Sequence, residues 1–300
     1  MIVPAYNAGQ YVERCLTSVL NLPLRLNLLI TVVNDGSTDN TAEVLLKYED
    51  NPRVEVITQE NRGFFGARNR GLDDVKSRYI MFMDSDDELL RGVDLDSLLQ
   101  FVDTRQLDIL ECGYVTFSDS SDLDEFRLES KVANHANGLL HGYPWGKLIR
   151  AELFEKVRFP EGYWFEDTVM SFVVFPMCKK VDTSSTLLYH YRINPAGITA
   201  TSRGRAKSVD TYWVTEQLLR DRATLGLKND EEFAKVMLDQ VRMNYGRLRN
   251  LGRLNVQRAV FVLTSRLWRQ YFGNINVESP LAYALADSNF LRYRLLLEFS

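Results

Sequence analysis

Two aspartates separated by one residue, Asp84 and Asp86 with Ser85 between them, follow an apolar stretch typical of a strand. Two carboxylates at a strand end can converge on one hard cation. Mg²⁺ and Mn²⁺ take oxygen ligands and often share them with substrate phosphates. An isolated Asp-x-Asp is more often a solvated turn, so the interpretation depends on the other polar motifs of the chain.

A second candidate ligand group is Asp35, which follows the apolar run 28–33 and precedes Gly36. An aspartate at a strand tip can accept a hydrogen bond from the imide N–H of a nucleobase, and Gly36 permits a tight turn beside it. The alternative is a turn and helix cap, because Asp, Ser and Thr all cap helices well.

A loop rich in glycine and arginine runs from Asn61 to Gly71 and includes Gly66 and Arg68. Glycine permits close approach of a ligand, and arginine binds phosphate or carbonyl oxygens through its planar guanidinium. The spacing of the glycines matches neither the dinucleotide-binding fingerprint nor the phosphate-binding loop of nucleoside triphosphatases. The alternative is a basic turn that starts a helix.

A candidate general base lies at Glu166 and Asp167, directly after an aromatic segment that includes Trp164. A carboxylate beside bulky rings is partly desolvated, which raises its pKa and makes it a better base near neutral pH. The alternative is a surface acidic pair at a helix start.

Two further segments carry candidate substrate contacts. Trp145 lies in a Gly/Pro turn and could stack on a sugar, or it could be a packed loop tryptophan. Arg192, with residues 197–199 after it, could belong to a segment that closes on a phosphate, or to a strand followed by a loop.

The elements that must position these residues alternate between strand and helix patterns. The expected strands are residues 2–4, 28–33, 54–57 and 79–83, and the expected helices are 12–20, 40–48 and 66–75. Alternation of this kind predicts a mostly parallel sheet, in which ligands bind at the carboxyl ends of the strands. The polar clusters follow those ends. Long helical patterns dominate from about residue 202.

The composition is that of an ordinary globular protein. The 300 residues are 45% hydrophobic and 25% charged, and 36 Lys and Arg against 40 Asp and Glu give a net charge of −4. This balance argues against a nucleic-acid-binding protein and against disorder. We expect no transmembrane helix and no signal peptide. Three widely spaced cysteines predict neither a disulfide framework nor a zinc site, and they favour a reducing cytoplasm.

Five short blocks in one order resemble family 2 of the glycosyltransferases, which has the GT-A fold. They are residues 3–7 (VPAYN), 33–39 (VNDGSTD), 61–71, 83–87 (MDSDD) and 166–167 (ED), within residues 1–200. The resemblance implies an α/β, Rossmann-like sheet flanked by helices. It also implies inverting transfer from a nucleotide sugar, often a UDP-sugar, with Mn²⁺ or Mg²⁺.

The resemblance also implies roles for individual residues. Those expected to hold the nucleotide sugar are Pro4, Ala5, Tyr6, Asn7, Asp35, Asn61, Gly66, Arg68, Asp84, Ser85 and Arg192. Asp86 is expected to bind the metal that bridges the diphosphate. Asp167 is expected to be the catalytic base, with Glu166 beside it shaping the acceptor site, and Trp145 and Trp164 are expected to border the acceptor.

Two features depart from the family pattern. Met1 lies almost at the first motif, so the first strand is expected to be short, or the chain to be a fragment or to have a misassigned start. Where the family often has Gly-Ser-Ile-Thr, this chain has Ala196 to Thr199 and lacks the serine.

We therefore expect a catalytic domain at 1–200, with a nucleotide half of about 1–105 and an acceptor half of about 106–200, and a helical region at 201–300. The expected activity is transfer of a sugar to a hydroxyl of a glycan or lipid-linked acceptor in cell-envelope or surface polysaccharide synthesis. The alternatives are a sugar-phosphate nucleotidyltransferase and a non-catalytic nucleotide-sugar-binding protein.

Residues 241–272 contain seven arginines and no acid, interleaved with aromatic and aliphatic residues. A basic amphipathic helix of this kind can lie on an anionic membrane surface from the cytoplasmic side. The alternative is a helical subdomain that packs on the transferase.

Overall fold

The computed structural model describes residues 1–118, 121–128, 139–165, 167–195, 197, 201 and 204–298, with the backbone alone for 121–124. The chain divides into two compact units. The first comprises Met1–Gly162 and Val174–Asn194, and the second comprises Tyr163–Val173 and Pro195–Ser300. Residues 163–173, which carry the candidate base, therefore group with the C-terminal helices rather than with the sheet that surrounds them in sequence.

The first unit contains the strands and the helices α1 to α5. The strands are β1 (Ile2–Ala5), β2 (Ile30–Asp35), β3 (Val54–Gln59), β4 (Tyr79–Ile80), β5 (Glu88–Leu89), β6 (Ile109–Ser118), β7 (Ser121–Phe126), β8 (Lys147–Arg150) and β9 (Val181–Arg192). The helices are α1 (Val12–Leu20), α2 (Thr41–Leu46), α3 (Gly63–Asp73), α4 (Leu95–Arg105), the 3₁₀ turn η1 (Ala151–Phe154) and α5 (Phe175–Met177). The π-helical turn η2 (Met170–Val174) ends at the boundary between the units.

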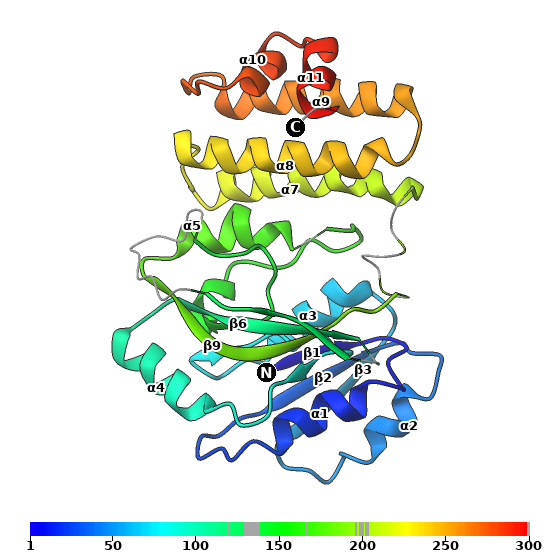
Figure 1. The fold of residues 1–300 in the computed structure, drawn as a ribbon, viewed down its shortest axis with the longest axis vertical. Helices are drawn as coiled ribbons and strands as arrows, with labels where there is room; N and C mark the ends of the chain where they lie inside the picture. Colours follow the sequence, from blue (N-terminus) through cyan, green and yellow to red (C-terminus); the bar gives the residue numbers. More distant parts are fainter. Residues whose placement is uncertain are drawn as a thin grey trace. The chain divides into compact units, whose positions relative to one another are not determined.

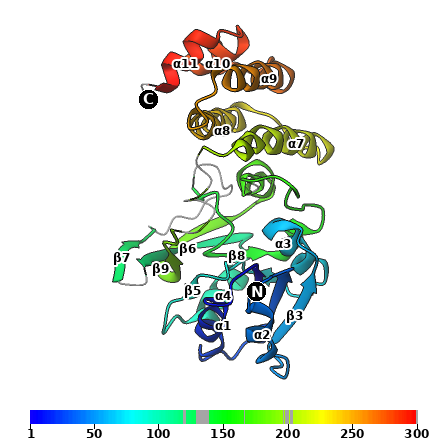
Figure 2. The ribbon, with the colours of Figure 1, turned by 90° about the vertical axis from the view of Figure 1, so that its right-hand side faces the viewer.

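Strands β1, β2 and β3 form a parallel sheet in that order, as the alternation of strand and helix patterns predicts. Figures 1 and 2 show α3 on one face of this sheet and α1 on the other. Because both faces are covered, β2 is buried along most of its length. Gly71 allows α3 to approach closely, since a Cβ atom there would lie 2.5 Å from Cγ2 of Ile2.

The second sheet has the order β4-β8-β6-β9-β5, with β7 paired to β6. Phe82 forms two isolated parallel bridges, to Ile2 of β1 and to Trp145, so the expected strand at 79–83 is split into β4 and these bridges. Strands β6 and β9 run parallel, whereas β8 and β7 pair antiparallel to β6. The fold is thus a mixed α/β arrangement, and the expected α/β class is confirmed.

The start of α2 differs in detail from the sequence pattern. Asn40 and Glu43 have the spacing of a capping pair, but the Asn40 side chain makes no capping hydrogen bond. The carboxylate of Asp39 accepts the N–H of Thr41 at 2.9 Å instead, and its other oxygen accepts the N–H of Gly9 at 3.0 Å. Asp39 therefore joins the loop after β1 to the loop after β2, and these hydrogen bonds lower its pKa although burial opposes them.

The second unit is helical. Its helices are α7 (Asp210–Thr224), α8 (Glu231–Arg249), α9 (Leu254–Phe272), α10 (Pro280–Ala286) and α11 (Phe290–Glu298), preceded by the 3₁₀ turn η3 (Ala206–Val209). Helices α7, α8 and α9 pack side by side in the order of the chain, and α10 and α11 pack on α9 (Figure 1). In the part of the chain that is described, no helix is both long and apolar enough to cross a membrane.

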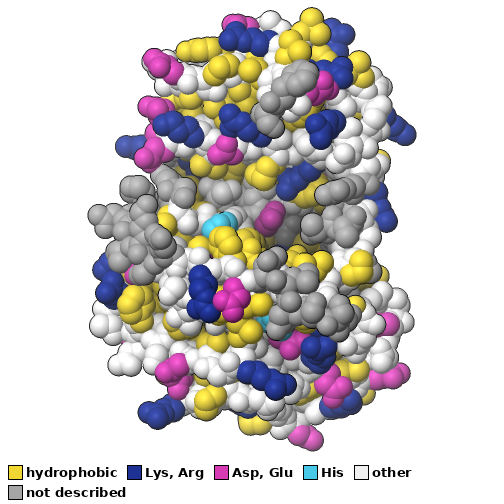
Figure 3. All heavy atoms as spheres, viewed as in Figure 1, with side chains coloured by type: hydrophobic (Ala, Val, Ile, Leu, Met, Phe, Trp, Pro, Cys, Tyr) yellow, Lys and Arg dark blue, Asp and Glu magenta, His cyan; other side chains and the backbone are white. Residues whose placement is uncertain are grey.

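The apolar side chains of residues 241–272 are largely buried within this helical unit. Tyr245, Phe261 and Trp268 are each 3% exposed or less. These three rings cannot insert into a bilayer while the unit is folded. The structure therefore does not present them on the surface of an amphipathic helix. Figure 3 shows basic side chains dispersed among acidic and apolar ones on the face of these helices that it presents.

Candidate active site

The carboxyl ends of β1 and β2 lie next to each other, because Ala5 pairs with Asn34 in the parallel register. The same register places Asp35 opposite Gln59 at the end of β3. Ile2 also bridges Phe82, two residues before Asp84, on the other side of β1. The loops after β1 and β2 and the acidic turn at 84–87 therefore meet at one edge of the sheet, as the sequence predicts.

Asp35 is 1% exposed, and its two carboxylate oxygens have different environments. Oδ1 accepts hydrogen bonds from Nε2 of Gln59 at 2.6 Å and from the backbone N–H of Arg62 at 2.9 Å. Oδ2 is buried and has no hydrogen-bond partner among the described residues. A buried acceptor without a donor is costly, so this oxygen is suited to a ligand N–H.

The loop after β1 is attached to the loop after β2 by Asn7. Its side-chain oxygen accepts the N–H of Thr38 at 2.8 Å, and its own N–H donates to Oγ of Ser37 at 3.0 Å. Asn7 has a φ of 50°, a left-handed conformation that asparagine tolerates better than most residues. Pro4 and Ala5 are buried, while Tyr6 is 49% exposed beside them.

The glycine- and arginine-rich loop forms the start of α3. Oδ1 of Asn61 accepts the N–H of Gly63 at 3.1 Å. Gly66 allows the first turn to pack, because a Cβ atom there would lie 2.4 Å from Cβ of Arg62. The buried Arg68 places its Nη2 atom 2.7 Å from Oδ1 of Asp84, with its guanidinium 5.5 Å from the Phe159 ring. Arg68 therefore orients Asp84 in this structure.

The acidic motif is a turn, in which the carbonyl of Asp84 accepts the N–H of Asp87 at 3.1 Å. Ser85, between the two candidate ligands, is half-buried. Oδ2 of Asp86 accepts a hydrogen bond from Nδ2 of Asn194 at 3.0 Å. Burial raises the pKa of Asp86, and the negative charge of Asp84 raises it further. Nearby positive charge would stabilise the ionised form of this carboxylate.

A cation at this turn would be held by few protein ligands. No group of three or more His, Cys, Asp or Glu side chains with metal-binding geometry occurs among the residues whose placement is described. Mg²⁺ and Mn²⁺ are commonly bound through one or two carboxylates together with substrate phosphates. The donor set of Asp84 and Asp86, with Asp86 destabilised as an anion, fits a cation that arrives with a diphosphate.

Arg192, at the end of β9, is 3% exposed. Its Nε atom donates to the backbone carbonyl of Asp86 at 2.8 Å, and its Nη2 atom lies 3.3 Å from Oε1 of Glu88. The guanidinium also lies 4.3 Å from the Phe117 ring. Closure of this arginine over a diphosphate would require these contacts to break, so Arg192 supports the acidic turn here. Ala196 and residues 198–199 lie outside the described part of the chain.

Trp145 is packed rather than presented to a ligand. Its ring stacks on Tyr143 at 3.8 Å and on Tyr189 at 4.7 Å, and the residue is 9% exposed. In the described part of the chain Tyr143, Tyr189 and Tyr191 pack against the indole, which is the arrangement of the packed-loop alternative. The expected role of Trp145 at the acceptor stays a prediction.

The candidate base, Asp167, lies in the second unit, at the start of a helical turn in which its carbonyl accepts the N–H of Met170 at 2.9 Å. The preceding aromatic segment is held in place within that unit. The N–H of Trp164 donates to Oδ2 of Asp210 at 3.0 Å, and Arg247 lies 3.7 Å from the Phe165 ring. Phe165 has a φ of 67°, a strained conformation for an aromatic residue. Glu166 lies outside the described residues.

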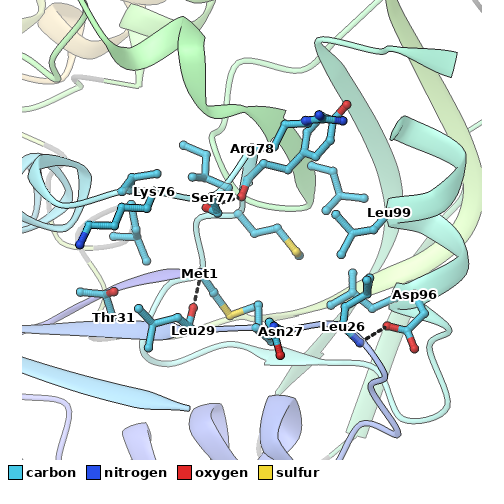
Figure 4. Close-up of a pocket in the computed structure, with 18 of the residues that line it drawn as sticks. Met1, Leu26, Asn27, Leu29, Thr31, Lys76, Ser77, Arg78, Asp96 and Leu99 are labelled. Atoms are coloured by element: carbon cyan, nitrogen blue, oxygen red, sulfur yellow. Dashed lines mark hydrogen bonds between the residues drawn. The ribbon is translucent and has the colours of Figure 1, made fainter. Parts of the chain in front are cut away.

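A cavity of about 1840 Å³ opens at the opposite ends of the parallel strands (Figure 4). Met1, Leu29 and Tyr79 contribute to its lining, and the amino group of Met1 donates to the carbonyl of Leu29. The described residues of this lining include neither Asp35 nor Asp84. The cavity is therefore separate from the edge where the candidate ligand residues meet.

Comparison with known proteins identifies the family. The model of glycosyl transferase family 2 matches residues 1–164, more than half of the chain. The chain belongs to family 2 of the glycosyltransferases. The glycosyltransferase GlyA of Streptococcus pneumoniae serotype 4 is 32% identical over an alignment of 216 residues that covers 66% of this chain and 31% of that protein. The uncharacterized glycosyltransferase EpsJ of Bacillus subtilis strain 168 is 32% identical over an alignment of 217 residues that covers 66% of this chain and 62% of that protein.

The chain thus matches less than two thirds of the length of these two relatives. Among solved structures, S. aureus TarS residues 1–349 in complex with UDP-GlcNAc has a TM-score of 0.78, covering 99% of this chain and 89% of that chain. At 20% sequence identity this similarity shows the fold, including the C-terminal helices. The expected family and GT-A fold are confirmed.

Sequence reasoning missed three residues that shape the site: Asp87, Tyr189 and Asn194. Asp87 was part of the acidic motif, but no role followed from its position. Tyr189 and Asn194 lie more than 100 residues from the turn that they contact. No local sequence spacing predicts a contact between residues so far apart. The available indication was that Tyr189 and Asn194 lie close to Arg192 in the sequence.

Proposed function

We propose that the chain is the catalytic part of an inverting glycosyltransferase that transfers a sugar from a UDP-sugar to a hydroxyl of a glycan or lipid-linked acceptor. The observation that carries this proposal is the unpartnered Oδ2 of Asp35 at the same sheet edge as the Asp84–Asp87 turn. A uracil imide N–H is a donor of the kind that this oxygen lacks. The complex of the TarS structure with UDP-GlcNAc supports the donor class.

The residues of the site would divide the work as follows. Asp35 binds the base, and the Asp84–Asp86 turn faces the donor sugar and diphosphate. A divalent cation bound at Asp86 would offset the charge that develops on the UDP leaving group. Asp167 removes the proton of the acceptor hydroxyl while that oxygen attacks the anomeric carbon from the face opposite the leaving group. A single displacement of this kind inverts the anomeric configuration.

A UDP-release screen across UDP-sugars with Mn²⁺ or Mg²⁺, followed by acceptor profiling, tests the proposal. Turnover that needs the cation and produces free UDP supports it. Formation of pyrophosphate from a nucleoside triphosphate and a sugar phosphate would instead identify a nucleotidyltransferase. Binding of UDP-sugar without any UDP release, with or without acceptor, would identify a non-catalytic binding protein.

We also propose a peripheral contact of residues 241–272 with an anionic membrane surface. Arg258, Val262 and Arg266 are exposed at intervals of four residues on α9, which places them on one face of the helix. Basic residues near an anionic surface contribute about 1 kcal/mol each to the free energy of membrane binding.

The three cysteines, which are all free and buried, support a reducing compartment.

Sedimentation with anionic vesicles at low and high salt tests this contact. Binding at low salt should be lost in the double variant Arg258→Gln/Arg266→Gln and kept in Lys235→Gln, which changes an exposed basic residue on α8. Equal binding by both variants, or no binding by the unmodified protein at either salt concentration, would refute it.

A further inference from the structure

The acidic turn contains a carboxylate, Asp87, whose hydrogen bonds are made within the protein. It is 1% exposed, and both of its oxygens are occupied by β9. Oδ2 accepts the hydroxyl of Tyr189 at 2.7 Å, and Oδ1 accepts the backbone N–H of Arg192 at 2.7 Å. A carboxylate is costly to bury, so one that is bonded through both oxygens is expected to have a structural purpose at the site.

Tyr189 makes a second contact with the same turn. Its hydroxyl accepts the backbone N–H of Asp84 at 3.0 Å while it donates its proton to Asp87. One hydroxyl therefore holds the first and last residues of the turn that carries Asp86. Arg68 and Asn194 hold the side chains of Asp84 and Asp86, whereas Tyr189 holds the backbone between them.

The position of the Tyr189 hydroxyl is itself determined by packing. Tyr189 is 0% exposed, and its ring stacks on Trp145 at 4.7 Å and an interplanar angle of 15°. Trp145 stacks in turn on Tyr143 at 3.8 Å and 8°. A ring confined in this way cannot rotate its hydroxyl away from the turn without disturbing the whole stack.

We propose that Tyr189 is a positioning residue that holds the Asp84–Asp86 turn in the geometry that binds the cation–diphosphate part of the donor. Asp87 is its fixed acceptor, and Trp145 acts through Tyr189 and not on the acceptor sugar. The inference rests on the proposed function, because it concerns the ligand of that same site.

Calorimetry of UDP binding, with Mn²⁺ and with EDTA, tests the inference on Tyr189→Phe. This variant keeps the stacked ring and removes only the hydroxyl. Leaving a buried N–H and a carboxylate without their partner should weaken UDP binding in Mn²⁺ by about 10- to 100-fold. Binding in EDTA, which depends on the base-binding end at Asp35, should change by less than about twofold.

Tyr114→Phe is the matched control, because Tyr114 contacts Trp145 edge-on at 5.1 Å and its hydroxyl is not bonded to the turn. It should bind UDP like the unmodified protein under both conditions. Asp87→Asn is a second test, since an amide offers one acceptor for two donors and should show the same selective loss. Hydrogen exchange at residues 84–87 should quicken about tenfold in Tyr189→Phe and stay unchanged in the control.

Thermal unfolding of each variant shows whether it is folded at the assay temperature. Equal Mn²⁺-dependent binding by Tyr189→Phe and the unmodified protein would overturn the inference and leave the proposed function intact. An equal loss in Mn²⁺ and in EDTA would also overturn it, because that pattern indicates general loss of structure. Failure of the unmodified protein to bind UDP under either condition would overturn the proposed function and this inference with it.

Discussion

The environment of Asp35 leads to a prediction about nucleobase specificity, which depends on the Oδ2 atom of its side chain. In Asp35→Asn the side chain keeps its shape but exchanges one oxygen for an NH₂ group. Oδ1 must remain an oxygen, because two donors, Nε2 of Gln59 and the N–H of Arg62, already point at it. The NH₂ group is therefore expected in the place of Oδ2, where a donor now replaces an acceptor.

The magnitude follows from the hydrogen bond that is exchanged. Under the proposed function uracil presents its imide N–H to this position, and a hydrogen bond to a charged group contributes about 1.5–3 kcal/mol. Loss of that bond should weaken UDP binding by about 10- to 150-fold, at about 1.4 kcal/mol per factor of ten. Cytosine carries a ring nitrogen with a lone pair at the same position, so CDP should gain affinity in the variant.

Competition between UDP and CDP in the presence of Mn²⁺ measures the change directly. We expect the unmodified protein to prefer UDP and Asp35→Asn to lose or reverse that preference, while Asp50→Asn, at an exposed turn, behaves like the unmodified protein. A UDP-to-CDP affinity ratio that stays within about twofold in Asp35→Asn, with unchanged thermal stability, would show that Oδ2 does not contact the base.

Further predictions concern the base, the cation and a buried ion pair. Asp167→Asn should lower sugar transfer by about 10²- to 10⁴-fold and keep UDP affinity; near-normal turnover would exclude Asp167 as the base. Asp86→Ala should abolish the Mn²⁺ dependence of UDP binding, and unchanged calorimetry with Mn²⁺ would exclude the metal assignment. Glu111 and Lys147 are both fully buried with Nζ 3.5 Å from Oε1, so Glu111→Gln should cost about 3–5 kcal/mol in chemical denaturation, and Glu111→Gln/Lys147→Met should recover much of it. Burial lowers the pKa of Lys147 from 10.5 to about 8, so the unfolded chain binds more protons between these values. The free energy of unfolding of the unmodified protein, relative to that of Lys147→Met, should therefore rise with pH by up to about 1.4 kcal/mol per unit. A difference that stays constant or falls with pH would contradict a buried lysine that loses its proton in this range.

The order of strands and helices, the parallel sheet and the row of polar loops at its carboxyl edge all follow from local patterns in the sequence. Apolar residues at helical spacing in 12–20 and β-branched runs such as 28–33 need no distant partner to be recognised. The edge at which Asp35 and Asp84 meet also follows, because parallel strands joined by helices place their carboxyl ends together. Hence the fold class, the family and the meeting of these polar loops at one sheet edge could be predicted.

The state of each functional side chain depends on contacts between residues far apart in the chain, and only the tertiary structure decides it. Trp145 has the sequence context of a sugar-stacking residue, but tyrosines of β9 and of its own loop enclose it. Asp87 is bound to Tyr189 across 102 residues, and Arg192 donates to Asp86 across 106. Burial, and hence the choice between ligand contact and internal support, is a property of the packed chain. Sequence identified which chemical groups reach the sheet edge, and packing determined which of their atoms remain for a ligand.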